Sequence, residues 1–290
     1  MDKVFECLGK IGIVPVVVLD DAKDAEALGQ ALMDGGLPCA EVTFRTAAAE
    51  ESIRIMAKKF PNMIVGAGTV LTIDQVNRAW DAGSKFIVSP GLNPKIVEYC
   101  LNRGIPVCPG TCTPSDVERA LDFGLDAVKF FPAEPSGGLK FIKAIAAPYT
   151  NVKFMPTGGI NAQNVRDYLA YSRILACGGS WMVPGDAIKA KDWQRITEIT
   201  RSAVDKMLGF ELRHVGINSG SPEQALKDAE ALAKLLNWPV KPGNSSTFAG
   251  TGFECMKEPG RGQHGHIAIA TNSLKRAKWH LEQRGYVFDE

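Results

Sequence analysis

The sequence lacks an excess of charge of either sign. Its 33 Lys and Arg residues stand against 32 Asp and Glu residues, which leaves a formal net charge of +1. A protein that binds nucleic acid or a membrane surface mainly through electrostatics usually carries a clear basic excess. The balance therefore argues against nucleic acid or a membrane as the main partner.

Long hydrophobic runs are also absent. The apolar run from Ile11 to Leu19 is too short to span a bilayer, and it contains Pro15. It coincides with a predicted strand and has no cleavage site after it, so we do not interpret it as a signal peptide.

The seven cysteines form no recognisable framework, because they are odd in number and scattered. Cys108 and Cys112 are separated by three residues, but no second pair or histidine cluster accompanies them, as a zinc site would require. We expect reduced thiols, several of them buried, in a cytoplasmic protein.

What the sequence does contain is a regular alternation of short apolar runs with amphipathic stretches. The runs follow one another at a spacing of about 20–25 residues, which is typical of a (β/α)₈ TIM barrel. An open, doubly wound parallel sheet is the structural alternative. The eight runs are Val14–Leu19, Cys39–Phe44, Met63–Ala67, Lys85–Ser89, Ile105–Cys108, Ala127–Phe131, Val152–Pro156 and Arg173–Cys177.

This pattern ends after a helix predicted over Asp192–Met207, which Gly209 stops. We therefore expect two domains, 1–209 and 210–290. The second begins with a strand at His214–Asn218 and a helix at Pro222–Leu236. After three short strands, Gly265–Ala270 repeats the pattern of the first strand, and a helix follows it.

Lys129 ends the apolar run Ala127–Phe131, and Pro132 stops the strand. A strand this apolar is buried on both faces, as parallel strands are. Burial favours the neutral form of an amine, which is the nucleophile that forms a Schiff base with a ketone. The alternative is a lysine that reaches the solvent or makes a structural ion pair.

Other polar residues lie at further strand ends, where the chemistry of a TIM barrel collects. Glu41 and Arg45 follow the second run, and they suit proton transfer and recognition of a carboxylate. They could equally form a surface ion pair. Two double-glycine turns end the seventh and eighth runs, and together they favour a phosphate site built from backbone N–H groups.

Six motifs in unbroken order resemble the 2-keto-3-deoxy-6-phosphogluconate / 4-hydroxy-2-oxoglutarate aldolases, over about residues 1–208. The resemblance implies a class I aldolase on a (β/α)₈ barrel, usually a homotrimer and independent of metal or other cofactors. The motifs are Glu41–Thr46, Val65–Val70, Ser89–Leu92, Val128–Glu134, Pro156–Ile160 and Gly178–Pro184.

The resemblance also implies roles for individual residues. Lys129 would carry the Schiff base, and Glu41 would act as general acid and base with a bound water. The pyruvoyl end would be surrounded by Arg45, Thr69 and Pro90, with Phe131 and Thr157 beside it. The phosphate would be held by Gly158, Gly159, Gly179 and Ser180. Phe44 departs from the family, whose members often have leucine there.

The expected reaction is cleavage of 2-keto-3-deoxy-6-phosphogluconate, a phosphorylated 2-keto acid of the Entner–Doudoroff pathway, to pyruvate and glyceraldehyde 3-phosphate. Cleavage of 4-hydroxy-2-oxoglutarate to pyruvate and glyoxylate is a second expectation. Alternatives are an aldolase for the galactonate epimer, a phosphate-binding isomerase or epimerase without a covalent lysine, and a regulatory protein with a ligand-sensing tail.

The segment from about Glu211 resembles the vicinal oxygen chelate, or glyoxalase-like, superfamily. Leu212–Met256 has its βαβββ order, and Leu212–Glu290 covers one module and roughly half of a second. The resemblance places His214, Glu254 and His266 at three metal-ligand positions, which suit a divalent transition metal. The alternative is an α+β appendage that serves assembly or stability.

Overall fold

The computed structural model describes residues 1–260 and 262–289, which form two compact units. Unit 1 contains Met1–Leu208 and the chain from Ser273 onward, and unit 2 is Gly209–Asn272. This division differs from the expected 210–290 segment, because the last helix packs with unit 1. Within the described residues, no helix has both the length and the apolar character needed to cross a membrane.

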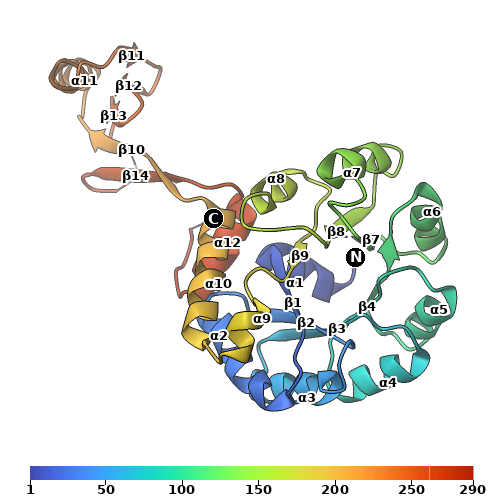
Figure 1. The fold of residues 1–290 in the computed structure, drawn as a ribbon. Helices are drawn as coiled ribbons and strands as arrows, with labels where there is room; N and C mark the ends of the chain where they lie inside the picture. Colours follow the sequence, from blue (N-terminus) through green and yellow to red (C-terminus); the bar gives the residue numbers. More distant parts are fainter. Residues whose placement is uncertain (261, 290) are drawn as a thin grey trace. The chain divides into compact units, whose positions relative to one another are not determined.

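Unit 1 is built on short parallel strands (Figure 1). Almost all residues of these strands are buried. Six of the strands pair in the order β5-β4-β3-β2-β1-β9, and three in the order β6-β7-β8. The strands are β1 (Ile13–Val17), β2 (Cys39–Thr43), β3 (Ile64–Gly68), β4 (Ile87–Val88), β5 (Val107–Cys108), β6 (Gly110–Thr111), β7 (Ala127–Phe130), β8 (Lys153–Pro156) and β9 (Cys177–Gly179).

The two groups of strands connect, so that the sheet curls around. The bridges Phe154↔Ile174 and Thr157↔Gly178 join β8 to the segment that ends in β9. On the other side, the backbone N–H of Lys129 donates to the carbonyl of Pro109, between β5 and β6. The result is a parallel, curled α/β sheet rather than a flat one.

Helices surround this sheet, and their starts follow local signals (Figure 1). Thr72, Asn93 and Thr113 each accept a backbone N–H at the start of a helix, as N-cap residues do. The helices are α1 (Lys3–Ile11), α2 (Ala25–Asp34), α3 (Ala49–Lys59), α4 (Ile73–Asp81), α5 (Pro94–Asn102), α6 (Pro114–Asp122), α7 (Gly138–Ala146), α8 (Val165–Ala170), α9 (Gly185–Lys189), α10 (Trp193–Leu208) and α12 (Leu274–Gln283), with a 3₁₀ turn at Ala22–Asp24.

The eighth strand begins later than the sequence predicts. Residues 173–176 carry one isolated bridge, and Ile174 closes a turn by donating its N–H to Tyr171. Regular pairing starts at Cys177, opposite Ile13 of β1. The apolar side chains that suggested a strand are buried in this connection instead.

Helix α12 packs in unit 1 through polar contacts as well as apolar ones. The guanidinium of Arg276 donates to the carbonyl oxygens of Gly9, Leu169 and Leu175 at 3.2–3.3 Å. The buried ring of His280 bonds to the carbonyl of Ile11 at 3.0 Å. These contacts explain why the chain returns to unit 1 after unit 2.

Unit 2 is a five-stranded sheet in the order β11-β12-β13-β10-β14, with one helix against it. Its elements are β10 (Glu211–Asn218), α11 (Pro222–Leu236), β11 (Val240–Pro242), β12 (Ser246–Ala249), β13 (Phe253–Met256) and β14 (Gly265–Ala270). The first five follow the βαβββ order. Its small core is formed by alanines of α11 with Ala249 and Cys255.

Candidate functional site

Lys129 lies on β7 with its side chain buried, and only 5% of the residue is exposed. Its Nζ is 2.9 Å from Oε1 of Glu41 and 5.6 Å from the centre of the Phe131 ring. The amine therefore does not reach the solvent, which was one form of the alternative interpretation, but it does make an ion pair with Glu41, which was the other form. Its ion pair is buried, where charges are retained only when they are closely partnered.

Glu41 comes from β2, 88 residues away in the sequence, and is completely buried. Its second carboxylate oxygen, Oε2, has no hydrogen-bond partner among the described residues, and the same holds for the buried hydroxyl of Thr157. Buried polar atoms are normally partnered, so exceptions call for an explanation. Both atoms are available to accept a hydrogen bond from a substrate or a water molecule.

Arg45 and Thr69 lie together at the ends of β2 and β3. The Nε of Arg45 is 3.4 Å from the hydroxyl of Thr69, at the long end of the hydrogen-bond range, and the arginine is exposed. Glu41 pairs with Lys129, so the ion pair considered for Glu41 and Arg45 does not occur. The exposed guanidinium can bind an incoming anion.

The two glycine turns are neighbours, because Thr157 bridges to Gly178. Gly158 and Gly159 have φ values of +100° and +82°, which favour glycine, and Gly159 is exposed. Gly179 is buried in β9, and the exposed Ser180 follows it. The bridge thus places two glycine-rich backbones side by side, as an anion site built from N–H groups requires.

One residue near this site was not selected from the sequence. Cys108 lies on β5, where burial raises the pKa of its thiol to about 12, with smaller electrostatic effects from Lys129 and Glu41. It is therefore a neutral thiol beside the ion pair. Pro90, which was selected, follows β4 and is half-buried. A cysteine at a strand end carries no signal that distinguishes it from an ordinary core residue.

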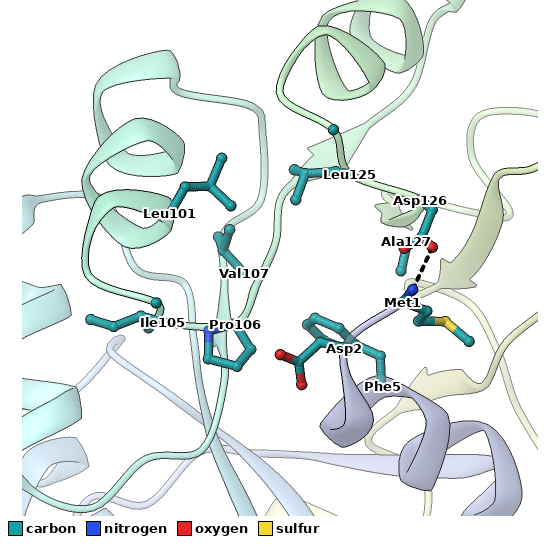
Figure 2. A pocket seen from close by; sticks show the side chains of 12 residues that line it. Met1, Asp2, Phe5, Leu101, Ile105, Pro106, Val107, Leu125, Asp126 and Ala127 are labelled. Atoms are coloured by element: carbon teal, nitrogen blue, oxygen red, sulfur yellow. Dashed lines mark ion pairs between the residues drawn. The ribbon is translucent and has the colours of Figure 1, made fainter.

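A pocket of about 260 Å³ lies at the opposite, amino-terminal ends of the strands (Figure 2). Phe5 of α1 lines it together with Pro106 and Ala127, and the amino group of Met1 pairs with Asp126 at 2.8 Å. In parallel sheets of this class the chemistry collects at the carboxyl ends. The Lys129 cluster is therefore the better candidate site.

In unit 2 the three expected ligand residues come together from neighbouring strands. The Nε2 atoms of His214 and His266 are 3.0 Å apart, and they lie 3.0 and 3.3 Å from Oε2 of Glu254. Strands β13, β10 and β14 are adjacent in the sheet, which brings these residues onto one face. Ser246 donates to the other oxygen of Glu254 at 2.7 Å.

A buried amine beside a carboxylate, at the carboxyl ends of a curled parallel sheet, defines an enzyme that can form an imine with a carbonyl substrate. The family model "KDPG and KHG aldolase" matches residues 4–199. The chain therefore belongs to this aldolase family, whose members are carbon–carbon lyases.

The chain is 47% identical over 204 residues to the 2-dehydro-3-deoxy-phosphogluconate aldolase of Treponema pallidum (strain Nichols), covering 70% of this chain and 97% of the relative. It is 46% identical over 193 residues to the KHG/KDPG aldolase of Escherichia coli (strain K12), covering 67% and 91%.

Among solved structures, KDPG aldolase from Legionella pneumophila, with pyruvate captured at low pH as a covalent carbinolamine, superposes with a TM-score of 0.67. It is 36% identical and covers 69% of this chain and 97% of the other. The 2-keto-3-deoxy-6-phosphogluconate aldolase of Zymomonas mobilis with 3-phosphoglycerate gives a TM-score of 0.65 at 40% identity, covering 69% and 94%.

Proposed function

We propose that unit 1 cleaves 2-keto-3-deoxy-6-phosphogluconate to pyruvate and glyceraldehyde 3-phosphate through a Schiff base on Lys129. The observation that carries the proposal is the buried contact of 2.9 Å between Lys129 and Glu41. Relatives at 46–47% identity bear the names of this activity. In this proposal the curled sheet and its helices form a (β/α)₈ barrel.

The proposed reaction begins when the Lys129 amine attacks the C2 ketone and water leaves. The protonated imine accepts the electron pair of the C3–C4 bond, while the proton of the C4 hydroxyl passes to Glu41 through a water molecule. The aldehyde departs, the enamine is protonated at C3, and hydrolysis frees pyruvate and the lysine. Both carboxylate oxygens have a use, because Oε1 faces the amine and Oε2 is free to bind the water.

The substrate is held at both ends in this proposal. Arg45, Thr69 and Pro90 surround the carboxylate of the pyruvoyl half, and Phe131 and Thr157 lie beside it. The backbones of Gly158, Gly159 and Gly179 bind the phosphate, with the hydroxyl of Ser180. The positive φ values of the first two and the bridge that joins the turns support this assignment.

Trapping with borohydride tests the covalent step. Pyruvate and borohydride should leave a reduced adduct on the peptide that contains Lys129, and Lys129→Met should abolish both the adduct and turnover. Lys140→Met is the matched control, since Lys140 is exposed on α7. An active enzyme without an adduct would favour the isomerase or epimerase alternative and overturn the proposal.

Substrate preference is tested by comparing kcat/KM for the phosphorylated gluconate, the phosphorylated galactonate and 4-hydroxy-2-oxoglutarate. We expect the phosphorylated gluconate to give the highest value, with 4-hydroxy-2-oxoglutarate as a second substrate, since the E. coli relative is named for both. We also propose that the protein is a homotrimer and that it is located in the cytoplasm. Light scattering of the purified protein tests the oligomeric state.

We further propose that unit 2, as a glyoxalase-like module, binds a divalent transition metal through His214, Glu254 and His266. The separations of 3.0–3.3 Å between their donor atoms support this. Ligands at bonds of about 2.1 Å stand about 3.0 Å apart in an octahedron and about 3.4 Å apart in a tetrahedron. A hydrogen-bonded cluster that only stabilises the sheet is the alternative.

Calorimetric titration of the full chain with Zn²⁺ or Co²⁺ distinguishes a metal site from a cluster that only stabilises the sheet. We expect one tight site, with a Co²⁺ absorption spectrum that His266→Ala abolishes. His264→Ala is the control, because His264 is exposed two residues away. Absence of binding, or equal binding by both variants, would leave the structural alternative.

A further inference from the structure

Glu41 occupies a space that depends on the residue next to it on β3. A Cβ atom built on Gly68 would lie 2.3 Å from Oε1, 2.7 Å from Cγ and 2.8 Å from Cδ of Glu41. Real side chains essentially never approach so closely. The side chain of Glu41 thus crosses the position that any other residue at 68 would fill.

The carboxylate has little freedom to move away from such an atom. Glu41 is completely buried, and its Oε1 accepts the hydrogen bond from Lys129 at 2.9 Å. The contact with Gly68 involves Cγ as well as the carboxylate, so turning the end of the side chain does not remove it. A displaced Glu41 therefore loses its position against the amine.

The backbone of Gly68 does not itself call for glycine. The φ angle of Gly68 is not among the positive values that the structure records for other glycines. Gly68 lies on β3 and pairs with Thr43 of β2. Gly66 on the same strand differs, because a Cβ there would meet the Phe86 ring at 2.2 Å, which is a matter of core packing. The nearest atoms to a Cβ at 68 all belong to Glu41.

We propose that Gly68 is a positioning residue for the aldolase reaction, because its missing side chain is the space that holds the Glu41 carboxylate against Lys129. The proposal rests on the proposed function of Glu41 as the group that moves protons. A catalytic group displaced by about 1 Å can cost about 10²-fold in rate. A displaced Glu41 should slow the proton transfers, whereas the amine of Lys129 should still form the Schiff base.

The test begins with Gly68→Ala. We expect kcat to fall by about 10²-fold, together with the rate of deuterium exchange at C3 of pyruvate. Borohydride trapping at Lys129 should persist, and KM should change less than kcat. A wild-type kcat and exchange rate would overturn the proposal. Failure of the wild-type enzyme to be trapped would refute the proposed function instead.

A second substitution makes the test specific. Glu41→Ala removes Cγ, Cδ and Oε1, the atoms that a Cβ at 68 would meet, so Gly68→Ala should cost much less in that background. If Gly68→Ala fails to fold, the double variant should fold again. A double variant as impaired as the sum of the two changes, or one that also fails to fold, would overturn the proposal.

Two further variants serve as controls. Gly185→Ala places a methyl group where no atom lies within 4 Å, and it should change neither stability nor kcat. Gly66→Ala strains the core against Phe86, so it should lower the melting temperature while kcat per folded molecule is kept. A loss of C3 exchange in Gly66→Ala equal to that in Gly68→Ala would reduce both residues to a packing role and contradict the proposal.

Discussion

Thr69 adopts a backbone conformation that its residue type disfavours, since its φ is +55°. A left-handed conformation costs a residue with a Cβ about 1–2 kcal/mol. Such strain is tolerated when the surroundings hold the residue in place, and it is frequent at functional sites. Here the turn presents the Thr69 hydroxyl to Arg45 at the open end of the site.

We therefore expect Thr69→Gly to trade affinity for stability. Removing the strain should raise the free energy of unfolding by up to about 1 kcal/mol. Losing the hydroxyl should raise KM for the keto acid roughly tenfold, as for one hydrogen bond to a charged group. Denaturant unfolding and steady-state kinetics measure the two effects.

Thr69→Ala is the matched control, because it removes the hydroxyl but keeps a Cβ in the strained position. It should raise KM to the same extent without any gain in stability. An unchanged KM in both variants would show that the Thr69 hydroxyl does not contact the substrate.

At the scale of elements, helix α6 shows how local sequence sets a boundary. Thr113 and Asp116 cap each other at its start, and Pro114 occupies the first turn. Burial raises the pKa of Asp116, but hydrogen bonds from the N–H of Cys112 and from the N–H and hydroxyl of Thr113 outweigh it. The pKa of Asp116 consequently lies below its ordinary value of 3.8.

A lowered carboxyl pKa links the stability of this cap to pH. The stabilisation is present above the unfolded-state pKa and is lost as pH falls through the lower folded-state pKa. Asp116→Asn should lower the free energy of unfolding by about 1 kcal/mol at pH 7. The difference between wild type and variant should shrink below about pH 4, where the unfolded carboxyl becomes protonated.

Asp122→Asn provides the comparison, because Asp122 is exposed at the other end of the same helix. Its effect on urea unfolding at pH 7 should stay within about 0.5 kcal/mol. Equal losses for the two variants would mean that the hydrogen bonds of Asp116 do not stabilise the cap.

For the whole molecule, unit 2 is inserted between two helices of unit 1, α10 and α12. Its ends lie side by side, because Glu211 pairs with Ala270 and a Cβ on Gly209 would touch Asn272. A short linker can therefore join Leu208 to Ser273 without stretching the chain. We expect a variant with Gly-Ser-Gly in place of 209–272 to keep the aldolase kcat within about twofold, since catalysis rests on unit 1.

A comparison of the linker variant with a truncated chain tests the role of α12. Truncation after Leu208 removes the donors that Arg276 and His280 supply to four backbone carbonyls. We expect this truncated chain to stay active but to melt several degrees lower than the linker variant, in line with about 2 kcal/mol for hydrogen bonds from a charged group. Loss of activity in the linker variant would show instead that unit 2 takes part in catalysis.

The sequence by itself determined the local units of this protein. All eight predicted strands overlap those observed, because apolar runs and turn residues act over a few neighbours. Lys129 and the glycine turns could be selected because strand ends can be located from sequence. The eighth strand was placed too early, since Ile174, Leu175 and Ala176 are buried in a connection and do not belong to a regularly paired strand.

The tertiary structure decided which of these residues meet. Glu41 contacts Lys129 across 88 positions, and the space beside Gly68 that admits it exists only when β2 and β3 pair in this register. The sequence places helix α12 in the expected domain 210–290, yet the helix packs with unit 1. Periodic patterns specify an element and its buried face, whereas its partner is chosen by packing and by the pairing of buried polar groups among distant parts of the chain.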